Sequence, residues 1–392
     1  MPPFSWDNLL LAKMLFWVGI AQCGWTFIFY PLIIQFLARI KSSDQGNPPI
    51  LQADLPAITI IIAANNEESR ICNRIKNLLQ CDYPSSLLEI LVVSDGSTDN
   101  TVGQLDSLEL VNLKVIAFPE KSGKPACLNA AVKEASGDWL IFADSRQNFA
   151  PDALQVLSRH FSNSSVAAIS GQLFPNTSEG GTARGIDFYW KMEKSLRYAE
   201  SQVDSCIGCT GAIYALRKEF FQPIPEDTLL DDVIIPLQAT HNGKRILFEP
   251  DAKAFDPQRL DPAVEKLRKA RTLAGNFQML FRYPGWLFPR ENRLWWKLFS
   301  HKYSRLLTPV SLMFALIGSW LSRDATPYQF FLGIQMFFYG LAIIGILCRG
   351  IRFPLFAIPA GFLFLSVMII RGFLYYLSGE YKAGWKKSPP TD

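Results

Sequence analysis

Four apolar stretches frame a polar middle in this chain. They cover residues 14–37, 306–321, 328–348 and 353–370. Each is close to the roughly 17 to 25 residues that a helix needs to cross the hydrocarbon core of a membrane. The sequence between the first two stretches is mixed in polarity and charged, as in a globular domain. We therefore expect one N-terminal span, a folded domain and about three C-terminal spans.

The first apolar stretch predicts a retained span rather than a signal peptide. It is longer than the apolar region of a signal peptide and is not followed by a small-residue cleavage site. Arg39 and Lys41 follow it, so the positive-inside rule places the domain in the cytoplasm. The basic residues next to the later spans agree: His301, Lys302, Arg305, Arg349 and Arg352.

The basic residues of the C-terminal tail disagree with this orientation: Lys382, Lys386 and Lys387. Three spans after the domain would leave them outside. Either the last apolar stretch, which Arg371 interrupts, is re-entrant or interfacial, or the rule fails locally.

Within the middle of the chain, short apolar runs alternate with amphipathic ones. Strands are predicted at residues 57–64, 89–94, 113–118 and 138–143, and helices at residues 67–80 and 124–135. This alternation predicts a parallel α/β sheet with right-handed connections, which binds ligands beyond the carboxyl ends of its strands.

Composition narrows the class further. The 392 residues are 49% hydrophobic, which is high for one soluble domain, and the formal charge of +4 favours lipid headgroups over nucleic acid. Seven cysteines show no disulfide framework. Cys206 and Cys209 form a CxxC that lacks the further ligands of a zinc site, so a buried pair is the simpler reading.

Polar residues follow two of the predicted strands. Asn65, Asn66 and Glu67 end the first strand and Asp95 ends the second, where they could accept hydrogen bonds from a nucleoside. The segment after Asp95 also reads as an ordinary turn and helix cap.

Candidate phosphate-binding residues come next along the chain. Lys124 begins a predicted helix, and it is either a phosphate ligand or a solvated lysine. Asp144 closes a strand, where it could hold a divalent ion that bridges two phosphates, and Arg146 stands where a second carboxylate would strengthen that site.

Two further pairs could take part in catalysis. Repulsion between the adjacent carboxylates of Asp231 and Asp232 raises one pKa, as a general base requires, although such a pair is often a solvated turn. Arg268 and Arg271 share one face of a basic helix and could clamp a diphosphate or rest on lipid headgroups.

In this order and spacing, the motifs resemble those of the membrane-embedded family 2 glycosyltransferases, the group with cellulose synthase, hyaluronan synthase and ceramide glucosyltransferase. Asn66-Glu67 and Asp95 match that family's nucleoside-binding positions. Asp144 matches the first position of its Asp-x-Asp motif, Asp232 its catalytic base, and Arg271 the arginine of its Gln-x-x-Arg-Trp motif. The likeness covers residues 57 to about 280.

Three positions depart from the family pattern. Arg146 replaces the second aspartate, Arg268 the glutamine and Thr272 the tryptophan. The last change weakens an assignment to the processive synthases and leaves single transfer open. The replacement by Arg146 leaves two alternatives for the phosphate site. Either Asp144 holds Mg²⁺ or Mn²⁺, or the guanidinium of Arg146 takes the place of the ion.

The resemblance implies a GT-A fold, a Rossmann-like and mostly parallel α/β sheet, as a cytoplasmic domain with transmembrane helices. It implies inverting transfer from a UDP-sugar to a lipid or glycan acceptor at the bacterial inner (plasma) membrane. Asp232 is the expected base with Asp231 as the next candidate; the other expected donor ligands are Asn66, Glu67, Asp95, Lys124, Asp144, Arg146, Arg268 and Arg271. An inactive scaffold is the rival reading, and a transporter is disfavoured because the spans contain only Arg371 as an internal charge.

The expected organisation has six parts. They are a span at 1–40, a linker at 41–56, the glycosyltransferase domain at 57–283, an interfacial amphipathic helix at 284–302, spans within 303–378 and a tail at 379–392. The interfacial helix is either an entry for the acceptor or a plain anchor. The sequence sets no oligomeric state.

Overall fold

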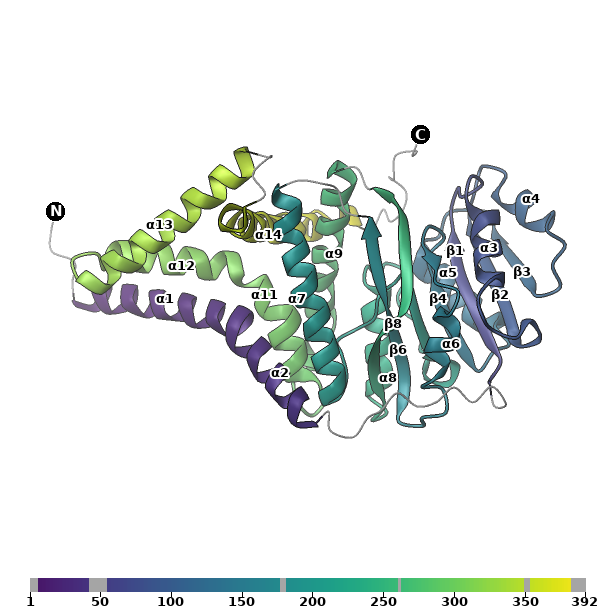
Figure 1. Cartoon of the computed structure of the whole chain (residues 1–392). Helices are drawn as coiled ribbons and strands as arrows, with labels where there is room; N and C mark the ends of the chain where they lie inside the picture. The colour runs from purple at the N-terminus through teal and green to yellow at the C-terminus, as the bar shows by residue number, and fades with distance from the viewer. Residues whose placement is uncertain (1–5, 42–54, 177–180, 260–261, 349–352, 382–392) are drawn as a thin grey trace.

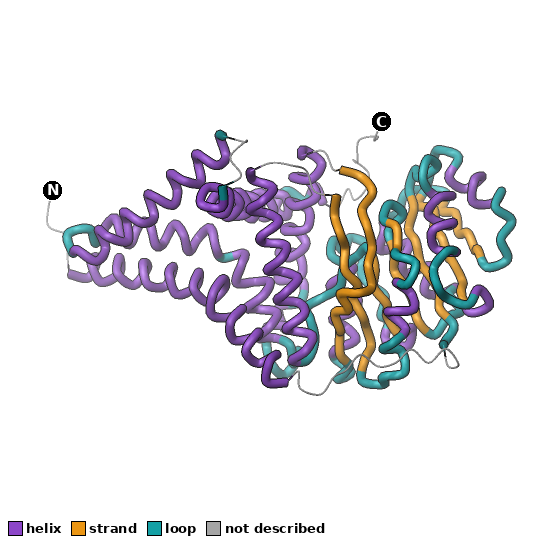
Figure 2. Tube along the Cα trace, in the orientation of Figure 1, coloured by secondary structure: helices purple, strands orange, loops and turns teal. Residues whose placement is uncertain are grey.

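The computed structural model describes residues 6–41, 55–176, 181–259, 262–348 and 353–381. A sheet flanked by helices forms one end of the molecule and a bundle of long helices forms the other (Figures 1 and 2). The N-terminal helix begins at the far tip of this bundle (Figure 1). Most of the expected linker and tail, with Arg349 and Arg352, lies outside the described residues.

Eight strands form one sheet in the order β3-β2-β1-β4-β7-β6-β8-β5. The first four strands along the chain pair in parallel, as the sequence predicts: β1 (Ile58–Ala64), β2 (Leu88–Asp95), β3 (Leu113–Phe118) and β4 (Trp139–Ala143). The other four are β5 (Asn148–Phe149), β6 (Val166–Asn176), β7 (Ile213–Arg217) and β8 (Arg245–Arg259).

The sheet as a whole is mixed, because antiparallel pairs occur in its second half, for which the sequence predicted no strands. β7 runs antiparallel to both β4 and β6, and β5 runs antiparallel to β8, whereas β6 and β8 are parallel. A short apolar run such as Ile213–Arg217 indicates a strand that is buried on both faces, but it does not indicate in which direction the strand runs.

Side chains of β1 alternate between two cores. Ile61 and Ala63 face α5 (Lys124–Glu134) and α8 (Asp231–Thr240), whereas Ile60 and Ile62 face α3 (Ile71–Leu79) and α6 (Ala153–Ser158). A further helix, α4 (Thr101–Asp106), lies between β2 and β3 along the chain. Burial on both faces explains why β1 is apolar at nearly every position.

The bundle contains the apolar stretches. Its helices are α1 (Trp6–Gly24), continued through a π-helical segment (Trp25–Phe29) into α2 (Tyr30–Lys41), then α12 (Thr308–Leu321), α13 (Thr326–Leu347) and α14 (Pro354–Leu377). Among the described residues, three helices are long and apolar enough to cross a membrane. A fourth span exists if α12 is counted with the helical segment 295–306, from which it bends by 62°.

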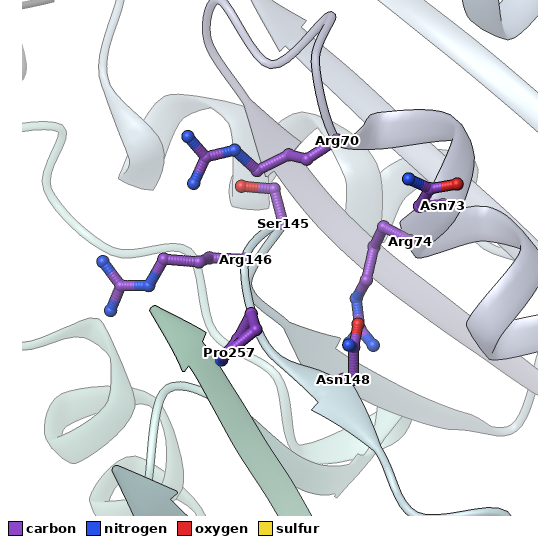
Figure 3. Close-up of a pocket in the computed structure, with 7 residues that line it drawn as sticks. All are labelled: Arg70, Asn73, Arg74, Ser145, Arg146, Asn148 and Pro257. Atoms are coloured by element: carbon purple, nitrogen blue, oxygen red, sulfur yellow. The ribbon is translucent and has the colours of Figure 1, made fainter. Parts of the chain in front are cut away.

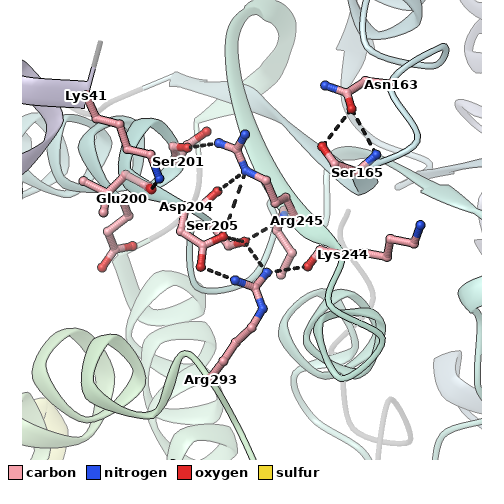
Figure 4. Close-up of polar contacts among 12 residues, drawn as sticks. Lys41, Asn163, Ser165, Glu200, Ser201, Asp204, Ser205, Lys244, Arg245 and Arg293 are labelled. Carbon is pink, nitrogen blue, oxygen red and sulfur yellow. Dashed lines mark hydrogen bonds and ion pairs between the residues drawn. The ribbon is translucent and has the colours of Figure 1, made fainter.

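Two long helices join the bundle to the sheet domain. α7 (Gly181–Val203) packs against α2 and α14, and α9 (Pro262–Arg282) packs against α14. Polar contacts hold the junction at the end of α7: Lys41 donates to the main-chain oxygen of Val203, and Arg293 pairs with Asp204 (Figure 4). Arg245 donates from Nε to the main-chain oxygen of Asp204, 2.7 Å away.

The expected amphipathic helix at 284–302 is wrong as a single helix. Pro284–Leu287 is a 3-10 turn, and helix resumes only at Trp295–Lys297, followed by a π-helical segment (Leu298–Tyr303) and α11 (Ser304–Leu306). Pro289 explains the break, because proline lacks the N–H that a helix interior requires. Trp286 and Lys297 are buried, whereas Phe288, Trp295 and Phe299 are exposed. The segment therefore packs against the rest of the protein on one side and leaves aromatic side chains uncovered on the other.

Candidate functional site

The candidate residues meet where the parallel strands end. β2, β1 and β4 are neighbours, and Asp95 and Asp144 stand at or directly after the ends of β2 and β4. Asn66 follows β1 with a φ of 56° and accepts a hydrogen bond on Oδ1 from the Thr98 amide at 2.8 Å. The turn after β1 is thereby tied to the turn after β2.

Asp95 is fully buried and holds the loop that precedes α5. Its Oδ1 accepts from the Ser122 amide at 2.6 Å, and its Oδ2 accepts from the Gly123 amide at 3.0 Å. This loop sets the start of α5, where Lys124 is the first residue. Because the carboxylate is covered by this loop, a nucleoside can reach it only if the loop moves away.

Glu67 faces the segment after β4. Ser145 donates to its Oε1 at 2.8 Å, and Arg70 pairs with its Oε2 at 2.8 Å. Burial raises the pKa of Glu67 despite the positive charge of Arg70 and the hydrogen bond from Ser145. The family-like Asn-Glu pair thus braces two turns at one edge of the sheet.

Lys124 bridges two aspartates that lie 87 positions apart in the sequence. Its Nζ lies 3.0 Å from Oδ1 of Asp144 and 3.2 Å from Oδ2 of Asp231. Burial lowers the pKa of Lys124, but the negative charges of Asp144, Asp231 and Asp232 outweigh this and raise it. Lys124 is therefore a fixed cation of the site and not a solvated lysine.

Asp144 remains ionised in this environment. Burial raises its pKa, but the positive charges of Lys124, Arg268 and Arg146 hold the pKa below its ordinary value. The side chain is 35% exposed, which leaves room for a ligand on the oxygen that Lys124 does not contact.

Asp232 has the opposite shift. Burial and the neighbouring charge of Asp231 raise its pKa to about 6, although Lys124 and Lys302 act against this. Its Oδ2 accepts a hydrogen bond from the Gly211 amide at 3.0 Å. Of the two adjacent aspartates, Asp231 is held by Lys124, and Asp232 has the character of a base that works near neutral pH.

The loop with the two cysteines supports Asp232, a role that the sequence did not reveal. The Cys209 amide donates to the main-chain oxygen of Asp232 at 2.7 Å. Arg197 on α7 holds the loop through Thr210 Oγ1 at 2.8 Å and the Gly208 oxygen at 3.1 Å. Both cysteines are buried, which agrees with the structural reading of this CxxC.

Arg146 forms its ion pair with a residue that the sequence did not predict for the site. Its Nη2 pairs with Oδ2 of Asp256 on β8 at 2.7 Å. Asp256 was not among the expected residues, because the sequence gives no sign that β8 passes the end of β4. Arg268 is exposed and Arg271 half-buried on α9, and Arg268 acts on Asp144 through its charge.

The basic residues at 301–305 serve an internal network. His301 is fully buried, with Nε2 2.8 Å from Glu193 and Nδ1 2.9 Å from Glu200, and Arg305 pairs with Glu193. His301 and Arg305 are thus engaged within the protein and are weak evidence for membrane orientation.

Among the described residues, no group of three or more His, Cys, Asp or Glu side chains is placed to hold a metal ion. Mg²⁺ is often held by one or two carboxylates together with substrate phosphates. The free oxygen of Asp144 fits that mode, in which the ion would share its ligands with a diphosphate.

Comparison with known proteins gives a family for part of the chain. Residues 59–224 match the protein-family model for glycosyl transferase family 2. This region is a family 2 glycosyltransferase domain. It contains the Asn66-Glu67 turn, Asp95, Lys124, Asp144 and Arg146, whereas Asp232 and Arg271 follow it.

Relatives of this glycosyltransferase domain include lipid and polysaccharide synthases. The chain is 29% identical over 163 residues to a beta-monoglucosyldiacylglycerol synthase of Synechocystis sp., a match that covers 39% of this chain and 34% of that protein. It is 23% identical over 246 residues to the poly-beta-1,6-N-acetyl-D-glucosamine synthase of Staphylococcus aureus, covering 58% and 59%. The matches thus span about a third and three fifths of these two relatives.

One solved structure shares the architecture over nearly the whole length. It is a mannosyltransferase from Pyrobaculum calidifontis in complex with GDP-Man and Mn²⁺, with a TM-score of 0.71 and 20% identity over 97% of this chain and 99% of that one. The expected GT-A fold is therefore confirmed, together with its frame of long apolar helices.

Proposed function

We propose that this chain is an inverting glycosyltransferase that moves a sugar from a UDP-sugar to a lipid or glycan acceptor at the membrane. The observation that carries the proposal is the pair of opposite environments at Asp144 and Asp232. One carboxylate is kept ionised among cations, and the other has its pKa raised to about 6 beside a buried neighbour. A site for group transfer needs both, one to organise the leaving phosphate and one to accept a proton.

Asp232 is the base in this proposal. Its carboxylate takes the proton of an acceptor hydroxyl as the hydroxyl oxygen forms a bond to the anomeric carbon. The bond between that carbon and the phosphate oxygen breaks, and its electron pair leaves with UDP. Attack opposite to the leaving group inverts the anomeric configuration. Gly211 and the loop that Arg197 holds keep the Asp232 carboxylate in place.

Cations stabilise the leaving group. Lys124 lies between Asp144 and Asp231, and Arg268 and Arg271 share a face of α9. Asp144 would hold Mg²⁺ or Mn²⁺, which supplies further positive charge to the diphosphate when bound. Asn66, Glu67 and Asp95 line the nucleoside end, where the loop held by Asp95 must open to admit a base.

The membrane frame supports a lipid or a membrane-delivered glycan as acceptor. The first two relatives reported above act in lipid and polysaccharide synthesis, as their names state. Arg39 and Lys41 after the first span support a cytoplasmic catalytic domain in the inner membrane. The six-part organisation expected from the sequence stays part of this proposal, except that 284–302 is not one helix.

A panel of radiolabelled sugar nucleotides tests the proposal. Membranes with the full chain are incubated with UDP-sugars and, because one structural neighbour holds GDP-Man, with GDP-mannose. Label that partitions into organic solvent identifies a glycolipid, and insoluble label identifies a polymer. A catalytically inactive scaffold, the alternative that Arg146 and Thr272 raise, predicts neither transfer nor hydrolysis of any donor.

A further inference from the structure

Lys302 lies between two residues of the buried internal network and differs from both of them. Its neighbours His301 and Arg305 pair with Glu193 of α7. Lys302 itself is half-buried, and its Nζ forms no hydrogen bond or ion pair with the residues that the structure describes. This Nζ is also not one of the described polar atoms that are both unpartnered and fully buried, so it stays accessible to a ligand.

Helix α7 connects the segment that contains Lys302 with the proposed base. Glu193 of this helix holds the segment through residues 301 and 305. One helical turn further on, Arg197 holds the loop whose Gly211 amide donates to the Asp232 carboxylate at 3.0 Å. The charges of Lys302 and Asp232 act on each other across this junction. Lys302 is therefore a cation within electrostatic reach of the base.

A different group of cations lies next to the proposed donor site. Lys124 and Arg146 act on Asp144 through their charges. Arg146 also lines a cavity beside the segment after β4, together with Arg70 and Arg74 (Figure 3). The lysine near the base is not part of this group. Since the base takes its proton from the acceptor, a cation beside it faces the acceptor and not the leaving phosphate.

The segment of Lys302 lies where the bundle of long helices meets the sheet domain. It belongs to the helical segment 295–306, which bends by 62° into the apolar α12. α11 directly follows the π-helical turn of Lys302 and lies between the bundle and the sheet domain (Figure 1). Trp295 and Phe299 of the same segment are exposed, as is typical of aromatic residues at the level of lipid headgroups. Lys302 is thus placed where a lipid phosphate would meet the protein.

We propose that the acceptor is an anionic phospholipid with a hydroxyl in its headgroup, and that Lys302 binds the phosphate of this lipid. The proposal rests on the function proposed above, in which Asp232 deprotonates an acceptor hydroxyl. A headgroup such as that of phosphatidylglycerol has a hydroxyl a few bonds from its phosphate, so a cation near a carboxylate matches its two groups. The hydroxyl oxygen bonds to the anomeric carbon as UDP leaves, and the lipid phosphate does not react. An ammonium suits it as a compact charge with three donors.

The acceptor preference of the purified full chain tests this proposal. Transfer from the donor that the radiolabel panel identifies is measured in mixed micelles with phosphatidylglycerol, phosphatidylinositol or neutral diacylglycerol. We expect kcat/KM to be at least about fivefold higher for one of the anionic lipids than for diacylglycerol, since one basic residue favours an anionic lipid by about this factor. The assays run at pH 8, where Asp232, with its pKa of about 6, is ionised.

Lys302→Gln should remove most of this preference, mainly by raising KM for the anionic lipid and not by lowering kcat. Lys302→Arg should keep the preference, because it retains the charge. Lys191→Gln is the matched control, since Lys191 is an exposed lysine of α7, and it should leave kcat/KM within about twofold. Melting temperatures are measured first, and if Lys302→Gln does not fold, the wild-type preference decides alone.

Three results would overturn the proposal: equal use of anionic and neutral lipids by the wild type, label that enters only a polymer, or a folded Lys302→Gln variant with the wild-type preference. In each of them sugar transfer still occurs, so the function proposed above would stand. Absence of transfer to every acceptor would overturn both proposals, and the two failures are therefore distinguishable.

Discussion

At the scale of single residues, the raised pKa of Asp232 predicts how the turnover number depends on pH. A base works only when ionised, and burial together with Asp231 raises this pKa to about 6. We predict that the turnover number is level above about pH 7 and falls toward tenfold per unit below about pH 6. Asp227→Asn, at an aspartate paired with Arg282, should keep this profile. A rate that stays level down to pH 4.5 would show that no group of this pKa acts as the base.

Asp144 makes a second prediction possible, because its free oxygen is the one protein ligand proposed for the divalent ion. Excess EDTA should abolish transfer, and added Mn²⁺ or Mg²⁺ should restore it, since one ammonium and nearby guanidinium groups neutralise a diphosphate only in part. Arg146→Asp should then lower the Mn²⁺ concentration needed for half activity. Full activity in chelator would instead assign the whole electrostatic role to Lys124 and the arginines.

The residues that the sequence predicted together are those at parallel strand ends. The rule that ligands bind beyond these ends placed Asp95, Asp144 and the Asn66-Glu67 turn at one edge. Gly211, Arg197 and Asp256 were missed because their roles arise from contacts across 13 to 110 positions of the chain. No local sequence pattern marks such contacts.

At the scale of elements, α9 lies against the residues that precede the catalytic pair. Gly275 makes this approach possible, because an added Cβ would lie 2.5 Å from Cγ of Leu230. Gly275→Ala should therefore lower the melting temperature and reduce turnover at least about tenfold, even though alanine favours helices by about 1 kcal/mol. Gly333→Ala on α13 is the control, since no atom lies within 4 Å of its added Cβ. Equal stability of the two variants would contradict this packing argument.

Elements were predicted well where periodicity was strong and poorly where proline interrupted a segment with the composition of a helix. The four parallel strands and α5 fall within a residue or two of their expected bounds. The helix expected from residue 67 begins at Ile71, because Glu67 to Arg70 form the turn that reaches β2's loop. Residues 284–302 match an amphipathic helix in composition, yet Pro284 and Pro289 divide them.

At the scale of the whole molecule, the end of α14 lies on the catalytic domain. An added Cβ at Gly372 would lie 3.2 Å from the Ala270 oxygen of α9, and Tyr376 stacks on Phe281 of the same helix. The tail should therefore emerge on the catalytic side, as its lysines require under the positive-inside rule. This favours the reading in which the last apolar stretch is re-entrant or interfacial.

Reporter fusions in a bacterial host test this topology. Green fluorescent protein fused to the C-terminus should fluoresce, and alkaline phosphatase at the same position should be inactive. Phosphatase fused after Asp324, between α12 and α13, should be active because this turn lies at the opposite end of the bundle from the sheet (Figure 1). An active phosphatase at the C-terminus would instead support a full last crossing.

The central claim, that Asp232 is the base of a glycosyl transfer, is tested most directly by Asp232→Asn. Asparagine keeps the shape and can still accept from the Gly211 amide, but it cannot take up the acceptor's proton. With the donor that the panel identifies, turnover at saturating acceptor should fall about 100-fold or more, while calorimetry gives a donor affinity within about twofold of wild type. A variant that keeps more than about a tenth of the wild-type rate would contradict the account and move the base elsewhere, with Asp231 as the next candidate.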